Sequence, residues 1–146
     1  MDNRYGYAYT GLTLMIVLLF IQFILGIFIN LYVSFPSLNS ISQVGPEVFP
    51  SNYITVMLHM MLGFLILIVS LIMILVSFRI GSAKLVFSSV VSSAFVVVAG
   101  VSGLLFLFNE YNRYSFLMAI SFIIIVISEF YYLYSLKSMG TKVVKN

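Results

Sequence analysis

Three side chains in this sequence could carry chemistry inside its long apolar segments, namely Gln22, His59 and Glu129. Polar and ionisable groups are costly in hydrocarbon, so an ionisable residue in a membrane-spanning helix is a functional hypothesis by default. Small helical bundles also use polar residues to hold helices together, because hydrogen bonds between helices stabilise them in lipid. Each of these residues therefore has a functional and a structural interpretation.

Glu129 lies in the last apolar segment, roughly 10 Å from its end at 1.5 Å per residue. Ser92 and Ser93 lie at a similar depth in the preceding segment. We expect their hydroxyls to bond the carboxyl, which would let it stay protonated and neutral. The functional alternative is a proton-coupling carboxylate in a small transporter.

His59 and Asn30 lie at equal depth in consecutive segments, which predicts a direct hydrogen bond between them. The functional alternative for His59 is an axial ligand of haem b, because four-helix membrane bundles commonly house this cofactor and imidazole nitrogen binds its iron. The chain has one histidine. A second axial ligand would therefore be a methionine, such as Met15 or Met118, or His59 of a second subunit. We favour the structural interpretation.

Gln22 lies in the middle of the first segment, and we expect its amide to bond the second or fourth segment. The sequence has no Gly-rich phosphate loop, no His-Glu-x-x-His motif and no paired aspartates. It also has no cysteine, which excludes disulfides and thiolate metal sites. We therefore predict no catalytic residues, no metal site and, unless His59 binds haem b, no cofactor.

The elements that must position these residues are membrane-spanning helices. The chain is 62% hydrophobic and 8% charged, with a mean hydropathy of +1.17, and a helix crosses a bilayer in roughly 20 residues. We predict an all-α membrane protein, one domain over residues 1–146. Its expected segments are spans at about 11–35, 54–78, 85–108 and 114–136, an outer loop at 36–53 and a tail at 137–146.

The basic residues predict the orientation of the spans. Those on one side of the predicted spans are Arg4, Arg79, Lys84, Lys137, Lys142 and Lys145. Only Arg113 falls on the other side, so the excess of positive charge places both termini in the cytoplasm and makes the bundle antiparallel. Tyr131, Tyr132 and Tyr134 fit a belt of aromatic side chains at the inner interface.

The tail lysines Lys137, Lys142 and Lys145 are dispersed and close to the membrane, so we expect them to contact anionic lipid headgroups and not nucleic acid. The plentiful Ile, Tyr, Phe, Asn and Ser and the absence of Trp suggest a genome rich in A and T codons. We therefore expect a multi-pass protein of a prokaryotic plasma membrane.

Small residues recur every seven positions in the last three spans, which predicts the faces that pack inward. The rows are Gly63, Ser70 and Ser77; Ser93 and Gly100, beside Ser89 and Gly103; and Ser121, Ser128 and Ser135.

Several short strings resemble a known family. They are Gln22–Gly26 with Asn30–Val33 and Pro36, Leu58–His59 with Leu62–Gly63, and Gly103 and Phe106 with Ser115–Ala119. Together they resemble an uncharacterised family of small four-helix integral membrane proteins of archaea and bacteria. The resemblance implies a fold and a membrane location and carries no activity.

The function that these features favour is a non-catalytic one. We expect a membrane protein that acts by association, as a homo-oligomer or as a small subunit of a respiratory or transport complex. The alternatives are an electron carrier with haem b at His59 and a small proton-coupled transporter that uses Glu129.

Overall fold

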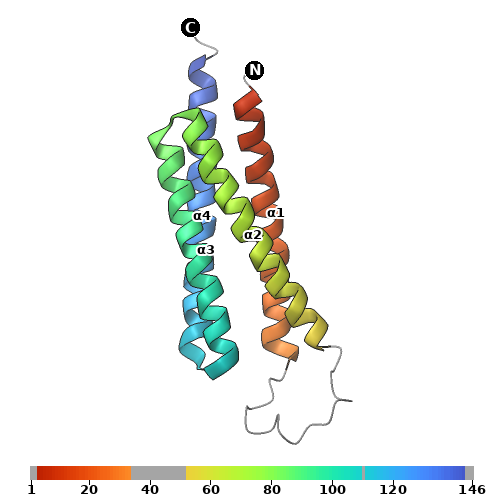
Figure 1. The fold of residues 1–146 in the computed structure, drawn as a ribbon. Helices are drawn as coiled ribbons and strands as arrows, with labels where there is room; N and C mark the ends of the chain where they lie inside the picture. Colours follow the sequence, from red (N-terminus) through yellow and green to blue (C-terminus); the bar gives the residue numbers. More distant parts are fainter. Residues whose placement is uncertain (1–2, 34–51, 110, 144–146) are drawn as a thin grey trace, which may run out of the picture.

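The computed structural model describes residues 3–33, 52–109 and 111–143. These residues form α1 (Asn3–Tyr32), α2 (Asn52–Ile80), α3 (Ala83–Asn109) and α4 (Asn112–Val143). All four helices are long and apolar enough to cross a membrane (Figure 1). The predicted all-helical class with four potential spans is confirmed.

The helices are longer than the predicted spans. α1 begins at Asn3 and not at residue 11, and α2 already contains Asn52 and Tyr53, which we had assigned to the outer loop. The rest of that loop, residues 36–51, lies outside the described residues. α4 continues to Val143, so most of the predicted tail is helical. Hydropathy marks where a helix crosses hydrocarbon, whereas the helix itself continues into the interface until a residue ends it.

A glycine makes the tight turn between α2 and α3. Gly81 has φ 76°, a left-handed conformation that favours glycine, and its N–H donates to the carbonyls of Ser77 and Phe78. Arg4 on α1 donates from Nη1 to the carbonyl of Arg79 at 3.0 Å, which ties the start of α1 to the end of α2. The start of α1, the end of α4 and this turn lie at the same end of the molecule, the upper end in Figure 1. We call it the terminal end.

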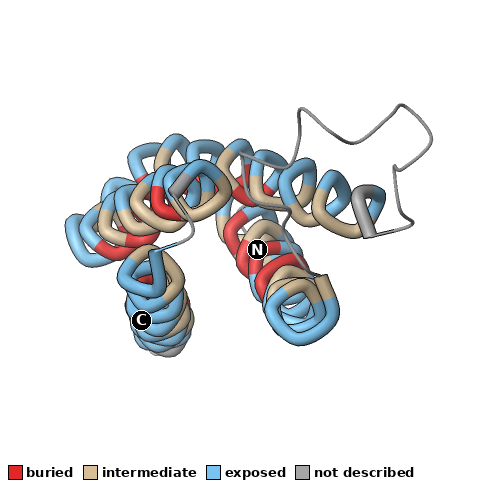
Figure 2. The backbone as a smooth tube through the Cα atoms, turned by 90° about the horizontal axis from the view of Figure 1, so that it is seen from below, coloured by how far each residue is buried: buried red, intermediate tan, exposed pale blue. Residues whose placement is uncertain are grey.

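The helices pack in chain order. α1 packs on α2, α2 on α3 and α3 on α4, whereas α1 and α4 touch only slightly. One contact between α1 and α4 is the stacked pair Phe23 and Phe122, with ring centroids 5.0 Å apart. Viewed along the helices, α1 and α4 lie on the same side of the layer formed by α2 and α3 (Figure 2). The interface between α1 and α4 is therefore the smallest of the helix–helix interfaces in the bundle.

The interior is rich in hydroxyl groups and the outer surface is apolar. The buried polar residues are Ser70, Ser77, Ser88, Ser89, Ser92, Ser93, Ser102, Ser121, Ser128, Ser135 and Glu129. Large apolar side chains such as Phe20, Phe64, Phe87 and Phe116 are exposed. This distribution suits a bilayer, where helices associate through close fit and hydrogen bonds because lipid is as apolar as leucine.

The serines of the predicted inward rows are buried, which confirms those faces. Gly63 is partly buried, but Gly100 is exposed, and a Cβ placed on it would meet no atom within 4 Å. The prediction for Gly100 is therefore wrong. α2 leans away from α3 toward the end opposite the terminal end (Figure 1), so the face of α3 that is covered at Ser93 is open at Gly100.

Candidate functional site

The first polar site joins α1 to α2. Nε2 of Gln22 lies 3.1 Å from Nε2 of His59. A Cβ on Gly63 would lie 3.3 Å from Nε2 of Gln22, and a Cβ on Gly26 would lie 3.4 Å from Cε1 of His59. Each helix therefore sets a glycine against the polar side chain of the other. The prediction that Gln22 bonds a neighbouring span is confirmed.

The predicted pair of Asn30 and His59 is wrong. Nε2 of His59 bonds Gln22, Nδ1 is buried with no hydrogen-bond partner, and the Asn30 side chain is exposed. Asn30 lies eight positions beyond Gln22, a rotation of about 80° at 3.6 residues per turn. Equal depth in the membrane therefore did not bring Asn30 onto the face that meets α2.

The amide of Gln22 faces one ring nitrogen of His59. With its nitrogen turned toward the ring, the amide donates and Nε2 of the ring accepts. Oε1 of Gln22 is also buried without a partner. A haem iron at Nε2 would have to displace Gln22, so this geometry favours the structural interpretation of His59.

The second polar site lies between α3 and α4. The Ser92 hydroxyl donates to Oε1 of Glu129 at 2.6 Å, and the carboxyl is buried, with 6% of the residue exposed. The Ser88 hydroxyl donates to the carbonyl of Ser128 one position earlier. Of the two expected partners, Ser92 is confirmed, whereas Oγ of Ser93 is buried and has no hydrogen-bond partner.

A third group of hydroxyls lies beside Glu129 and was missed by the sequence reasoning. The Tyr132 phenol and the Ser77 hydroxyl have oxygens 3.1 Å apart, and Ser89 lies 3.3 Å from Ser77. Tyr132 is 1% exposed, so its assignment to the interfacial belt is wrong, whereas Tyr131 and Tyr134 are exposed as expected. The signal was present, because Tyr132 lies four positions after Ser128 and three before Ser135, a spacing that keeps it near the face of the serine row on α4.

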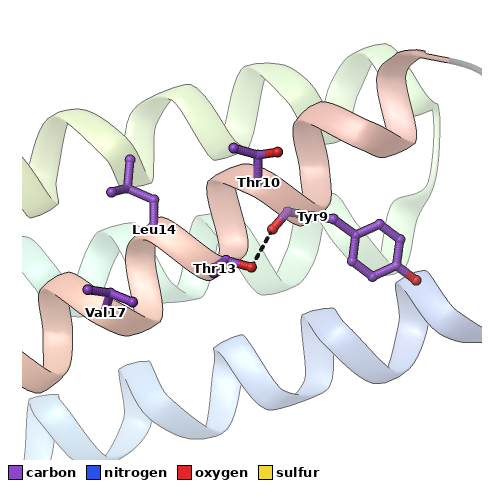
Figure 3. Close-up of a pocket in the computed structure, with 5 residues that line it drawn as sticks. All are labelled: Tyr9, Thr10, Thr13, Leu14 and Val17. Atoms are coloured by element: carbon purple, nitrogen blue, oxygen red, sulfur yellow. Dashed lines mark hydrogen bonds between the residues drawn. The ribbon is translucent and has the colours of Figure 1, made fainter.

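A shallow groove runs along α1. Its lining residues are Tyr9, Thr10, Thr13, Leu14 and Val17 (Figure 3). The Thr13 hydroxyl donates to the carbonyl of Tyr9 at 2.9 Å, the bond drawn in Figure 3. Thr10, Thr13 and Val17 are exposed, and a Cβ on Gly6 would meet nothing within 4 Å. This part of α1 is thus not covered by the described part of the chain.

The lysines expected to contact lipid headgroups are only partly described. Lys137 is exposed on α4. The Lys142 side chain and the whole of Lys145 lie outside the described residues. Contact with headgroups stays a prediction.

Comparison with known protein families, with curated proteins and with solved structures found no match. Within residues 3–33, 52–109 and 111–143, no three or more His, Asp or Glu side chains gather closely enough to hold a metal ion. The sites described above therefore carry the functional argument alone.

Proposed function

We propose that this protein is a multi-pass protein of a prokaryotic plasma membrane, an antiparallel bundle with both termini in the cytoplasm. The four apolar helices support a membrane location. The orientation rests on the basic residues, since Arg4, Arg79, Lys84 and Lys137 belong to the terminal end and Arg113 to the opposite end.

We further propose that it acts by association in the membrane, as a homo-oligomer or as a small subunit of a larger complex. The observation that carries this proposal is a row of small or β-branched residues on the uncovered part of α1, formed by Gly6, Thr10, Thr13 and Val17. These positions fall within about 60° of one another around a helix of 3.6 residues per turn.

Small residues allow two helix backbones to approach closely in lipid, and threonine hydroxyls can bond across the contact. The row lies on the side of α1 opposite its buried residues Ala8, Leu12 and Met15, where a helix of another subunit could pack. α3 also exposes small or β-branched residues, among them Ala94, Val97 and Gly100, but these have no hydroxyl group that could bond across a contact.

Disulfide cross-linking in native membranes tests the proposal, because the chain has no cysteine of its own. Thr13→Cys should form a cross-linked product under mild oxidation. Ile123→Cys is the control, since Ile123 is 56% exposed on α4 and lies outside the row. A product of twice the chain mass indicates a homo-oligomer, and another mass indicates a different subunit. Equal cross-linking at both positions, or none at Thr13, would contradict a homo-oligomer formed through α1.

Haem b at His59 is the less favoured alternative, because Gln22 engages the ring nitrogen that would meet the iron. A Soret band in the purified protein that is lost in His59→Leu would reverse this preference. The proton-coupling alternative does not involve His59, because it depends on the carboxyl of Glu129.

A further inference from the structure

Glu129 differs from the other buried polar groups because it can carry a full charge. Its hydrogen-bond partner is the neutral hydroxyl of Ser92, which donates to Oε1. The serines, by contrast, are uncharged in any state, and several donate to a carbonyl of their own helix. Among the buried residues that the structure describes, Glu129 is therefore the carboxyl, and its ability to bind and release a proton is not needed for helix packing.

A carboxyl is a poor choice where only close packing is required. Its desolvation is costly, and a well-packed apolar residue of similar volume often serves stability better than a buried charged group. Serine or alanine would fit a close α3–α4 contact without that cost. The position of Glu129 is therefore better explained by the proton that a carboxyl can bind.

Two buried hydroxyl groups of α4 lie between Glu129 and the terminal end. Tyr132 and Ser135 occupy the next two turns of α4 and are 1% and 2% exposed. The Tyr132 phenol interacts electrostatically with Glu129 and bonds Ser77, close to the end of α2. Oγ of Ser135 is buried with no partner, so its hydroxyl is free to turn and to hold a water molecule.

Along α4 in the other direction, the next buried hydroxyl beyond Ser128 is that of Ser121, about two turns away. Ser121 donates to the carbonyl of Leu117, and Ser70 donates to the carbonyl of Leu67. Both hydroxyls are committed to their own helices. On α4, the buried serine hydroxyl near Glu129 that makes no bond to its own helix, that of Ser135, therefore lies on the side of the terminal end.

We propose that Glu129 is a proton-binding site that exchanges with the aqueous phase at the terminal end, through Tyr132 and Ser135. On release, the carboxyl proton passes to the Tyr132 phenol, whose own proton leaves its bond to Ser77 and passes through Ser135 to water at the terminal end, so each hydroxyl ends with one proton. The carboxylate that remains is held by the Ser92 hydroxyl. This proposal is independent of association through α1.

The groups that face Glu129 are few. α3 presents the neutral serines Ser88 and Ser92 to α4, and Tyr132 is the titratable neighbour on α4 itself. The basic side chains of the packed helices, Lys84 and Lys137, lie toward the terminal end, each eight positions along its helix from Ser92 or Glu129, roughly 12 Å at 1.5 Å per residue.

Infrared difference spectroscopy of the protein in lipid nanodiscs tests the site. The sequence has four Asp and Glu residues, so a pH-dependent carboxyl band can be assigned. We expect Glu129→Gln to remove a C=O stretching band and Ser92→Ala to move it to higher frequency, because a hydrogen bond is lost. Glu129→Asp keeps a carboxyl and should shift the band without removing it.

The route is tested by the rate at which that band shifts after transfer into D2O. Ser135→Ala should slow the exchange several-fold, and this variant loses no hydrogen bond that the structure contains. Ser121→Ala is the matched control, also a buried serine on α4, and should leave the rate unchanged. The proposal fails if no pH-dependent band is lost in Glu129→Gln. It also fails if Ser121→Ala slows exchange as much as Ser135→Ala.

Discussion

The Tyr132 phenol on α4 lies 3.1 Å from the Ser77 hydroxyl on α2, although α2 and α4 do not pack directly on each other. Ser77 donates to the carbonyl of Met73 at 2.7 Å, so the phenol is the natural donor in the bond to Ser77. One side chain thus joins two helices that are otherwise connected through α3.

Tyr132→Phe should destabilise the bundle by about 1 kcal/mol, the net contribution of one hydrogen bond. The ring still fills its site, so the loss reports on the hydroxyl alone. Equilibrium unfolding in detergent measures it, with Tyr134→Phe as the control because Tyr134 is 72% exposed. Equal stability of the two variants would mean that the bond to Ser77 contributes nothing.

The glycines that face Gln22 and His59 should tolerate no bulky side chain. A Cβ at position 26 would lie 3.4 Å from Cε1 of His59, and a Cβ at position 63 would lie 3.3 Å from Nε2 of Gln22. The remaining atoms of a leucine side chain would therefore collide with these groups. Gly26→Leu and Gly63→Leu should both lower the melting temperature clearly more than Gly100→Leu, whose side chain enters open space. Similar melting of all three variants would argue against the close α1–α2 contact.

His59→Leu should destabilise the protein by roughly 1 to 2 kcal/mol, because it leaves the Gln22 amide without its partner in an apolar site. Gln22→Leu should cost a similar amount. In a double-mutant cycle, the second substitution should then add little. Additive losses would indicate that the two side chains do not interact.

Gly81→Ala should destabilise the α2–α3 turn by about 1 to 2 kcal/mol, because a residue with a Cβ is strained at a left-handed φ of 76°. Thermal unfolding measures the effect. Gly100→Ala is the control, since a Cβ there meets nothing within 4 Å and its φ needs no glycine.

The proposed orientation predicts opposite labelling of two exposed positions. In sealed cells, a membrane-impermeant maleimide should label Asn112→Cys at the start of α4 and should not label Ser138→Cys near its end. Labelling of Ser138→Cys without labelling of Asn112→Cys would mean that both termini face the outside.

The four helices could be predicted from sequence because lipid imposes a length and an apolar composition on anything that crosses it. Depth was also predictable, which is why Ser92 was correctly paired with Glu129. The rotation of each helix was harder to predict, since a side chain's depth does not state which neighbour it faces. Asn30 and Gly100 were therefore misplaced.

Tyr132 shows a related difficulty. Tyrosines near a span end usually lie at the interface, and three of them are close together on α4. The spacing of Tyr132, four positions after Ser128 and three before Ser135, indicated the interior instead. Where the two patterns disagreed, the spacing was the better guide, because it reports the face and the residue type reports only the depth.

The glycines opposite Gln22 and His59 also bear on how the chain assembles. If α1 slid along α2 by one turn, both large polar side chains would lose the glycines that make room for them, and their mutual hydrogen bond would break. This fit of side chains against glycines therefore favours a single register of α1 against α2. Since all of its parts lie in the first two helices, that hairpin can reach its final alignment in the membrane before α3 and α4 have been synthesised.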